Sequence, residues 1–144
     1  MPKATNACNN LLALIFNATT WDLIAENDTS GPATNLYLSL HTADPGVGGS
    51  QLTNETGYTN YARVAVARTT GGWTVPSGGA TENVALVQFP QCGVTGATVT
   101  HVAIGTAASG AGTVLYAGAL NASLPVANLI RPQFAAGDLT VTET

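Results

Sequence analysis

The chain has 144 residues, of which 45% are hydrophobic and only 8% are charged, and its formal net charge is -4. Typical globular domains carry about 25% charged residues, so Thr, Asn, Ser, Gly and small apolar groups must form much of this surface. The four cations are too few to neutralise nucleic-acid phosphates, and the lack of a basic amphipathic helix argues against a membrane surface. We therefore expect neither nucleic acid nor membrane as a partner. The low charge instead favours a protein that works inside an assembly.

Residues 5–17 carry the pattern of an amphipathic helix. Leu11, Leu12, Ile15 and Phe16 repeat at helical spacing and form one apolar stripe. The segment "TTWDLIAEN" at residues 19–27 predicts a further helical turn, which the segment "DTSGP" then breaks.

From residue 36 onward the hydrophobic period changes to two. Three leucines at positions 36, 38 and 40 alternate with Tyr37, Ser39 and His41, which predicts a half-buried strand with the leucines inward. Residues 48–57 read as a longer exposed loop. Strands are also predicted at residues 61–68, 83–89, 98–105, 113–120 and 138–143, separated by Gly-rich turns.

These patterns together predict a mainly β fold. The number of short strands and Gly-rich turns favours a single-domain antiparallel β-sandwich, jelly-roll-like, with a short N-terminal helical arm. We place the arm at residues 1–30 and the β-sandwich domain at residues 31–144.

His41, Asp44 and His101 are the candidates for a metal site or an acid/base pair. The strand alternation places both histidines on the side away from the apolar residues, so we expect them at a surface or interface, hydrogen-bonded to nearby backbone. Replacing His41 by Ala should then cost little stability. Asp44 has a simpler role, because its carboxylate can accept backbone N–H groups in the turn formed by Pro45 and Gly46.

No other residues form a catalytic pattern. Ser39 and Cys92 lack a nucleophile motif, the eight carboxylates are scattered, and the spacing of Cys8 and Cys92 fits no zinc site, so both are expected to be free thiols. We predict no catalytic, cofactor-binding or metal-binding residues, no cofactor and no enzyme activity. In so charge-poor a chain, each arginine should have a defined partner, either a carboxylate of this chain or a neighbouring subunit, and this applies to Arg63, Arg68 and Arg131.

The order of several sequence blocks carries a resemblance. The blocks "NNLLALIFNATTW", "NLYLSLHTADPG", "YTNYARVAVAR", "NVALVQFP", "VTHVAIGTAASGAGTVLYAGAL" and "RPQFAAGDLTVTE" follow one another over nearly the whole chain. This order resembles a group of small virion proteins of tailed bacteriophages, variously labelled tail-fibre-like, structural or capsid decoration (cement) proteins. The group has no catalytic motif. This chain departs from it in the helical arm, where Asn and Thr take positions often held by charged residues.

The resemblance implies a bacteriophage virion structural protein. As a decoration protein it would be made in the host cytoplasm and would bind the outer surface of the viral capsid. There it would bridge and stabilise neighbouring subunits of the major capsid protein, as a homotrimer or other small homo-oligomer. A tail fibre or baseplate component with an adaptor or host-receptor role is the alternative, and a hydrolase of host glycans is a third hypothesis.

Overall fold

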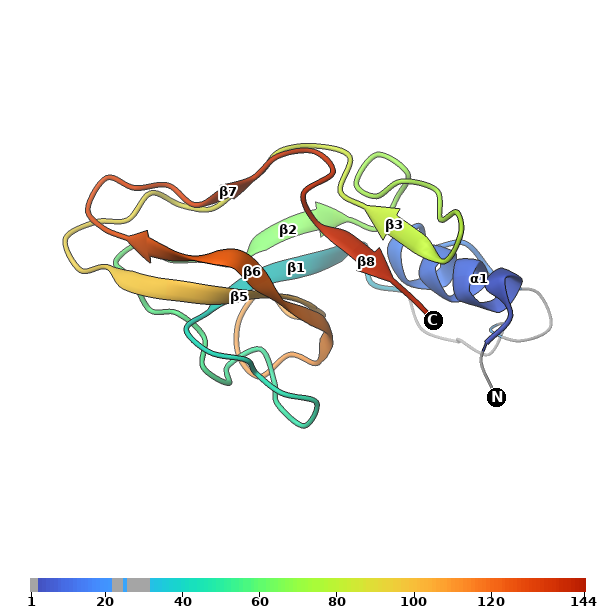
Figure 1. Ribbon diagram of the computed structural model, residues 1–144, viewed down its shortest axis with the longest axis horizontal. Helices are drawn as coiled ribbons and strands as arrows, with labels where there is room; N and C mark the ends of the chain where they lie inside the picture. The colour runs from blue at the N-terminus through green and yellow to red at the C-terminus, as the bar shows by residue number, and fades with distance from the viewer. Residues whose placement is uncertain (1–2, 22–24, 26–31) are drawn as a thin grey trace. The chain divides into compact units, whose positions relative to one another are not determined.

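The computed structural model describes residues 3–21, 25 and 32–144 (Figure 1). The predicted mainly β fold with antiparallel sheets and one short N-terminal helix is confirmed. Within the described residues no helix is long and apolar enough to cross a membrane. The elements are α1 (Thr5–Phe16), β1 (Asn35–His41), β2 (Val64–Ala67), β3 (Ala80–Glu82), β4 (Val87–Gln88), β5 (Ala97–Gly105), β6 (Val114–Val126), β7 (Gln133–Phe134) and β8 (Thr140–Thr142).

The strands form one four-stranded sheet and two strand pairs. The four-stranded sheet has the order β2-β1-β5-β6, and the pairs are β3 with β8 and β4 with β7. β1 with β5, β5 with β6, and β3 with β8 are antiparallel. The jelly-roll form of the predicted sandwich stays a prediction.

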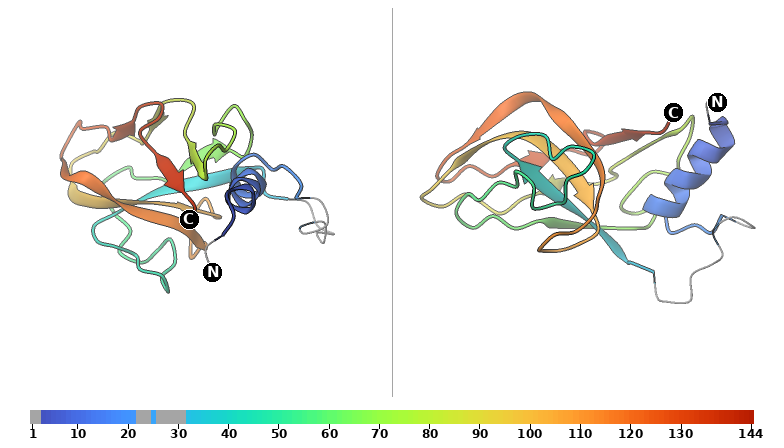
Figure 2. Two further views of the ribbon diagram at one scale, coloured as in Figure 1. Left: turned by 45° about the vertical axis from the view of Figure 1, so that its right-hand side comes forward. Right: turned by 90° about the horizontal axis from the view of Figure 1, so that it is seen from below.

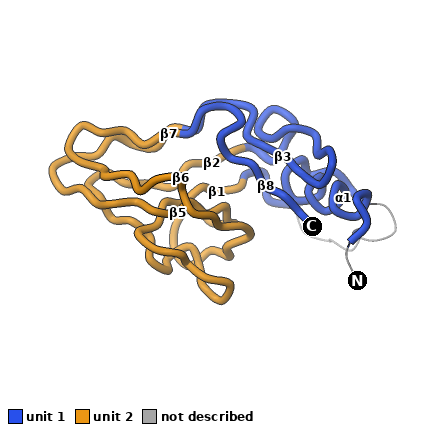
Figure 3. Tube along the Cα trace, viewed as in Figure 1, with its two compact units in different colours: residues 1–35, 67–87, 134–144 blue, residues 36–66, 88–133 orange. Residues whose placement is uncertain are grey.

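The chain forms two compact units (Figure 3). Unit 1 contains residues 1–35, 67–87 and 134–144, and unit 2 contains residues 36–66 and 88–133. The predicted division into an arm at residues 1–30 and a domain at residues 31–144 stays a prediction. The helical turn predicted at residues 19–27 falls largely outside the described residues.

In unit 2, the strand β1 is buried on both faces. Leu38 and Leu40 lie opposite Ile104 and Val102 of β5, and the predicted burial of the three leucines is confirmed. The prediction that the other face is exposed is wrong, because Ser39 and His41 have no exposed surface.

The segment that follows β1 explains this burial. It turns back along the strand end, with bonds from Thr42 N to Asn54 O (2.8 Å) and from Thr56 N to Leu40 O (2.8 Å). Gln51 and Thr56 are buried in it. The prediction of an exposed loop at residues 48–57 is therefore wrong at Gln51 and Thr56, whereas Leu52 is 53% exposed and Asn54 and Gly57 are exposed as predicted.

The antiparallel hairpin of β5 and β6 contains the two longest strands, and Figure 2 shows it from two further sides. Its pairing runs from Ala97 opposite Val126 to Gly105 opposite Val114, with irregularities between Val99 and His101 and between Ile104 and Gly105. The predicted strand at 113–120 thus extends to residue 126, while the one at 138–143 shortens to 140–142.

The strand predicted at residues 83–89 shortens to Val87–Gln88. Asn83 is the reason, because its side-chain amide donates to the carbonyl oxygens of Ala85 and Ala135, both at 2.8 Å. Its own Oδ1 accepts the Leu139 N–H at 2.9 Å. Local side-chain bonds of this kind compete with ladder hydrogen bonds and favour a turn.

In unit 1, the helix α1 buries Cys8, Leu12 and Phe16. The Phe16 ring meets Trp73 edge to face, with ring centroids 4.6 Å apart. The end of α1 has a specific cap, because Arg68 donates to the carbonyl oxygens of Leu14, Ile15 and Ala33, each at 2.6 Å. A cation at a helix C-terminus satisfies carbonyls that have no partner within the helix.

A matched pair of leucine variants tests the assignment of the unit 2 core. Leu38→Asp should abolish the native fold, because an unpaired buried charge costs several kcal/mol against a total stability of about 5–15 kcal/mol. Leu52→Asp makes the same change at an exposed position and should shift the free energy of unfolding by about 0.5 kcal/mol or less. Circular dichroism and urea unfolding measure both. A cooperatively folded Leu38→Asp variant would contradict the assignment.

Candidate functional site

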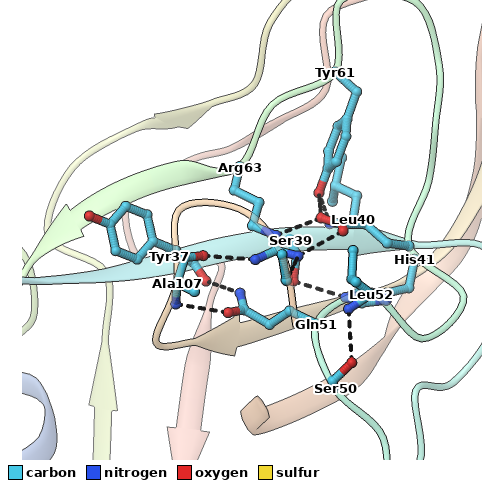
Figure 4. A network of polar contacts seen from close by, with 12 residues as sticks. Tyr37, Ser39, Leu40, His41, Ser50, Gln51, Leu52, Tyr61, Arg63 and Ala107 are labelled. Carbon is cyan, nitrogen blue, oxygen red and sulfur yellow. Dashed lines mark hydrogen bonds and ion pairs between the residues drawn. The ribbon is translucent and has the colours of Figure 1, made fainter. Parts of the chain in front are cut away.

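The candidate site in unit 2 is a group of buried polar side chains beside β1, which we call the buried polar cluster. Figure 4 shows most of its contacts. The cluster joins β1, the segment after it, the segment before β2 and the connection between β5 and β6. Its members are Ser39, His41, Gln51, Glu55, Tyr61 and Arg63.

The ion pair of Arg63 and Glu55 has two hydrogen bonds. Arg63 Nε donates to Glu55 Oε1 at 2.7 Å and Nη2 donates to Oε2 at 2.8 Å. The two side chains are only 2% and 12% exposed. The hydrogen bond to Glu55 raises the pKa of Arg63. Paired, planar donors of this kind fix geometry as well as charge.

Arg63 also holds the connection between β5 and β6. Its Nη1 donates to Ala107 O at 2.8 Å and its Nη2 donates to Gly110 O at 2.7 Å. One guanidinium therefore satisfies a carboxylate and two backbone carbonyls at once. We conclude that Arg63 fixes the connection at residues 106–113 against the segment before β2.

Tyr61 completes the surroundings of the carboxylate. Its hydroxyl donates to Glu55 Oε1 at 2.9 Å and accepts the Leu40 N–H at 3.0 Å. Burial raises the pKa of Tyr61 well above its usual range. The phenol therefore stays protonated and supplies a constant hydrogen bond.

Gln51 binds the same connection from another side. Its amide Nε2 donates to Tyr37 O at 3.1 Å, and its Oε1 accepts the Ala107 N–H at 3.0 Å. A Cβ atom at Gly105 or at Gly112 would lie 2.2 Å from the Gln51 side chain. Glycine at both positions is therefore what leaves room for the buried amide.

The geometry around His41 defines its tautomer. Nδ1 lies 2.9 Å from Thr53 O, and Nε2 lies 2.9 Å from Ser39 Oγ. A carbonyl oxygen can only accept, so Nδ1 carries the proton and the neutral Nε2 accepts from the serine hydroxyl. Burial lowers the pKa of His41, against a smaller opposing effect of the Thr53 carbonyl.

The predictions for His41 need correction. The expected surface position is wrong, because the chain after β1 covers this face and leaves the imidazole fully buried. The expected bond to nearby backbone is present, at Thr53. The expected low cost of His41→Ala no longer holds, since the change would leave Ser39 Oγ and Thr53 O without their partner.

Of the three candidates for a metal or acid/base site, the two histidines lie on paired positions of neighbouring strands. His101 lies directly opposite His41 in the pairing of β1 with β5, and its Nδ1 is 2.8 Å from Thr100 Oγ1. Asp44 Oδ1 accepts the Gly46 N–H at 2.8 Å, which confirms its predicted role in the turn. Among the described residues, no group of three or more His, Cys, Asp or Glu side chains could hold a metal ion.

The two cysteines and the three arginines singled out from the sequence have the following surroundings. Cys8 and Cys92 are buried free thiols, as predicted. Arg63 has the expected carboxylate of this chain, whereas Arg68 binds helix carbonyls and so differs from both expected kinds of partner. Arg131 is exposed and donates to the neutral Gln88 Oε1 at 3.1 Å.

The hydrogen bonds of the cluster hold backbone in place. Both ring nitrogens of His41 are engaged, and Ser39, His41 and Gln51 have no exposed surface. The exposed parts that it supports are the segment after β1 and the connection at residues 106–113. The cluster therefore fixes the backbone of these two loops.

Sequence reasoning did not identify Gln51, Glu55 and Tyr61 as members of a site. Glu55 and Arg63 could have been paired from the scarcity of charge, since the chain has only four cations. Gln51 and Tyr61 carry no such signal, because their burial depends on how the segment after β1 folds back.

The fold is that of a mainly β protein with antiparallel sheets. Residues 7–142 match the family model described as "Podophage GP4 fiber I protein gp80". The chain therefore belongs to this family, and it is a phage structural protein and a component of the virion. No curated protein matches the chain.

The pH dependence of stability tests the assignment of His41. Its ordinary pKa of 6.5 applies to the unfolded chain, and burial lowers the folded value. Between the folded and the unfolded pKa of His41, the unfolded state binds more protons than the folded state. The contribution of His41 to the free energy of unfolding is therefore present above pH 6.5 and is lost as the pH falls below it.

Urea unfolding from pH 7.5 to 5 should reveal this loss in the wild type and a flatter profile in His41→Gln. The variant His101→Gln retains His41 and serves as the matched control for removing a histidine. An unchanged slope in His41→Gln would contradict the assignment.

Proposed function

We propose that this protein is a structural subunit of a phage tail fibre. The match of residues 7–142 to a fibre protein family carries the proposal. The buried polar cluster is compatible with it, because its hydrogen bonds hold two surface loops of unit 2 in place.

The distribution of charge supports a role in protein assembly. Residues 83–130 contain no Asp, Glu, Lys or Arg, and this stretch includes β5 and β6. Charged groups are depleted in the buried parts of protein interfaces, since their desolvation is costly. We propose that the subunit associates with itself, as a homotrimer or other small homo-oligomer, and with other virion proteins.

Capsid decoration is the second candidate. In that role the protein would bind the outer surface of the head and bridge neighbouring subunits of the major capsid protein. The lack of internal fibre repeats in the sequence favours it, and the low charge is compatible with both roles. Stabilisation would then follow from binding to the assembled shell alone.

The proposal contains no catalytic step, cofactor or metal. Support comes from the burial of Ser39 and His41 and from the turn contact of Asp44. Purified protein should therefore leave host polysaccharide intact.

Antibody-fragment labelling of phage particles under the electron microscope tests the location. The fibre proposal predicts label on the tail or its fibres and an unlabelled head. Label spread over the head would contradict it and would support decoration. A fragment against a known major capsid protein is the positive control for access to the head.

A further inference from the structure

One end of unit 2 carries an exposed apolar surface that we call the apolar tip. It consists of Val94, Leu129 and Ile130, which are 87%, 69% and 43% exposed, beside the exposed Arg131. The loops that carry it are bonded together, with Cys92 N donating to Ile130 O (2.8 Å) and Leu129 N donating to Cys92 O (2.9 Å). The tip is therefore built on fixed backbone.

Leu129 has a backbone conformation that its exposed position does not explain. Its φ is 70°, in the left-handed region that branched L residues rarely adopt. Two contacts hold it there, the Leu129 N–H on Cys92 O and the Gln91 side-chain amide on Leu129 O (2.9 Å). Strain of this kind persists where surrounding bonds impose it, and such positions concentrate at functional sites.

A groove lies at the other end of the same hairpin. It has a volume of about 320 Å³ and is lined by Asp44, Gly46, Val47 and residues 114–117. This volume is at the lower end of the ~300–1,000 Å³ of ligand pockets, which suits a few side chains of a partner. Gly46 N–H occupies one acceptor position of the Asp44 carboxylate, and a carboxylate has several.

The tip and the groove are complementary in chemistry. The tip combines aliphatic side chains with one cation whose hydrogen-bond acceptor is the neutral Gln88 amide. The groove combines Val47, Leu115 and Tyr116 with one carboxylate. The other two charged residues of unit 2, Arg63 and Glu55, neutralise each other. Asp44 and Arg131 are thus the two charges of unit 2 left for a partner.

We infer that the apolar tip of one copy binds the groove of a second copy, with Arg131 of the first facing Asp44 of the second. This inference rests on the proposed self-association of the subunit. Because residues 94–97 and 126–131 lie at one end of the β5–β6 hairpin and residues 114–117 at the other, the contact is head to tail. Head-to-tail contacts close into rings or extend into filaments.

Charge exchange tests the contact in the full chain. Arg131→Asp and Asp44→Arg should each raise the dissociation constant for self-association about tenfold or more, because each places like charges together. Combining both changes in one chain should restore association. Sedimentation equilibrium over a range of concentrations measures it. Glu82→Arg alters an exposed carboxylate of unit 1 and is the matched control, expected to associate normally.

Two further variants distinguish loss of the contact from loss of the folded state. Asp44→Asn keeps an acceptor for the Gly46 N–H and should weaken association while preserving the folded state. Leu129→Gly removes both the strain and the side chain, so it should raise the urea midpoint of unfolding while weakening association. Leu86→Gly, at an exposed leucine of unit 1, should leave association unchanged.

Three outcomes are decisive. Weakened self-association of the single variants, with recovery in the variant that combines both changes, supports the contact. Normal association of the single variants, or no recovery, overturns the contact while leaving self-association in place. A monomeric wild type at all concentrations overturns self-association as well, whereas location on the particle is decided separately by labelling.

Discussion

The buried ion pair of Arg63 and Glu55 is the interaction on which the surface of unit 2 depends. It joins the segment after β1 to the segment before β2, and through Ala107 and Gly110 it fixes the connection between β5 and β6. Removing one partner of such a pair would leave an uncompensated buried charge, which costs about 3–5 kcal/mol. The pair therefore fixes the segment after β1 and the connection between β5 and β6 relative to each other.

This arrangement suits a protein that works as a structural part. The charges of unit 2 are few, and two of them are used internally, so the remaining surface is nearly neutral. A neutral surface pays a small free-energy cost of desolvation when it packs against another virion protein, because few charged groups lose their water. Rigid loops also reduce the conformational entropy lost on association. The family match shows a phage structural protein, and the low charge of this surface is compatible with the proposed role in assembly.

Much of the fold could be predicted from the sequence, because its main elements have clear periods. The stripe of residues 11–16 locates the helix, and the leucines of residues 36–40 locate β1 and its buried face. The burial of Ser39 and His41 could not be predicted, since it depends on the segment after β1 folding back over them. The φ of Leu129 could not be predicted either, because tertiary hydrogen bonds impose it on an ordinary leucine.

Native-state hydrogen exchange tests the role of the ion pair most directly. The informative amides are those of Ala107 and Gln51, which donate to Gln51 Oε1 and Gly112 O, compared with that of Leu38 in β1. In Arg63→Met the protection of Ala107 and Gln51 should fall by about 100-fold or more, and that of Leu38, which reports the loss of overall stability, should fall by no more than theirs. Unchanged protection at Ala107, or a larger loss at Leu38 than at Ala107, would contradict the account.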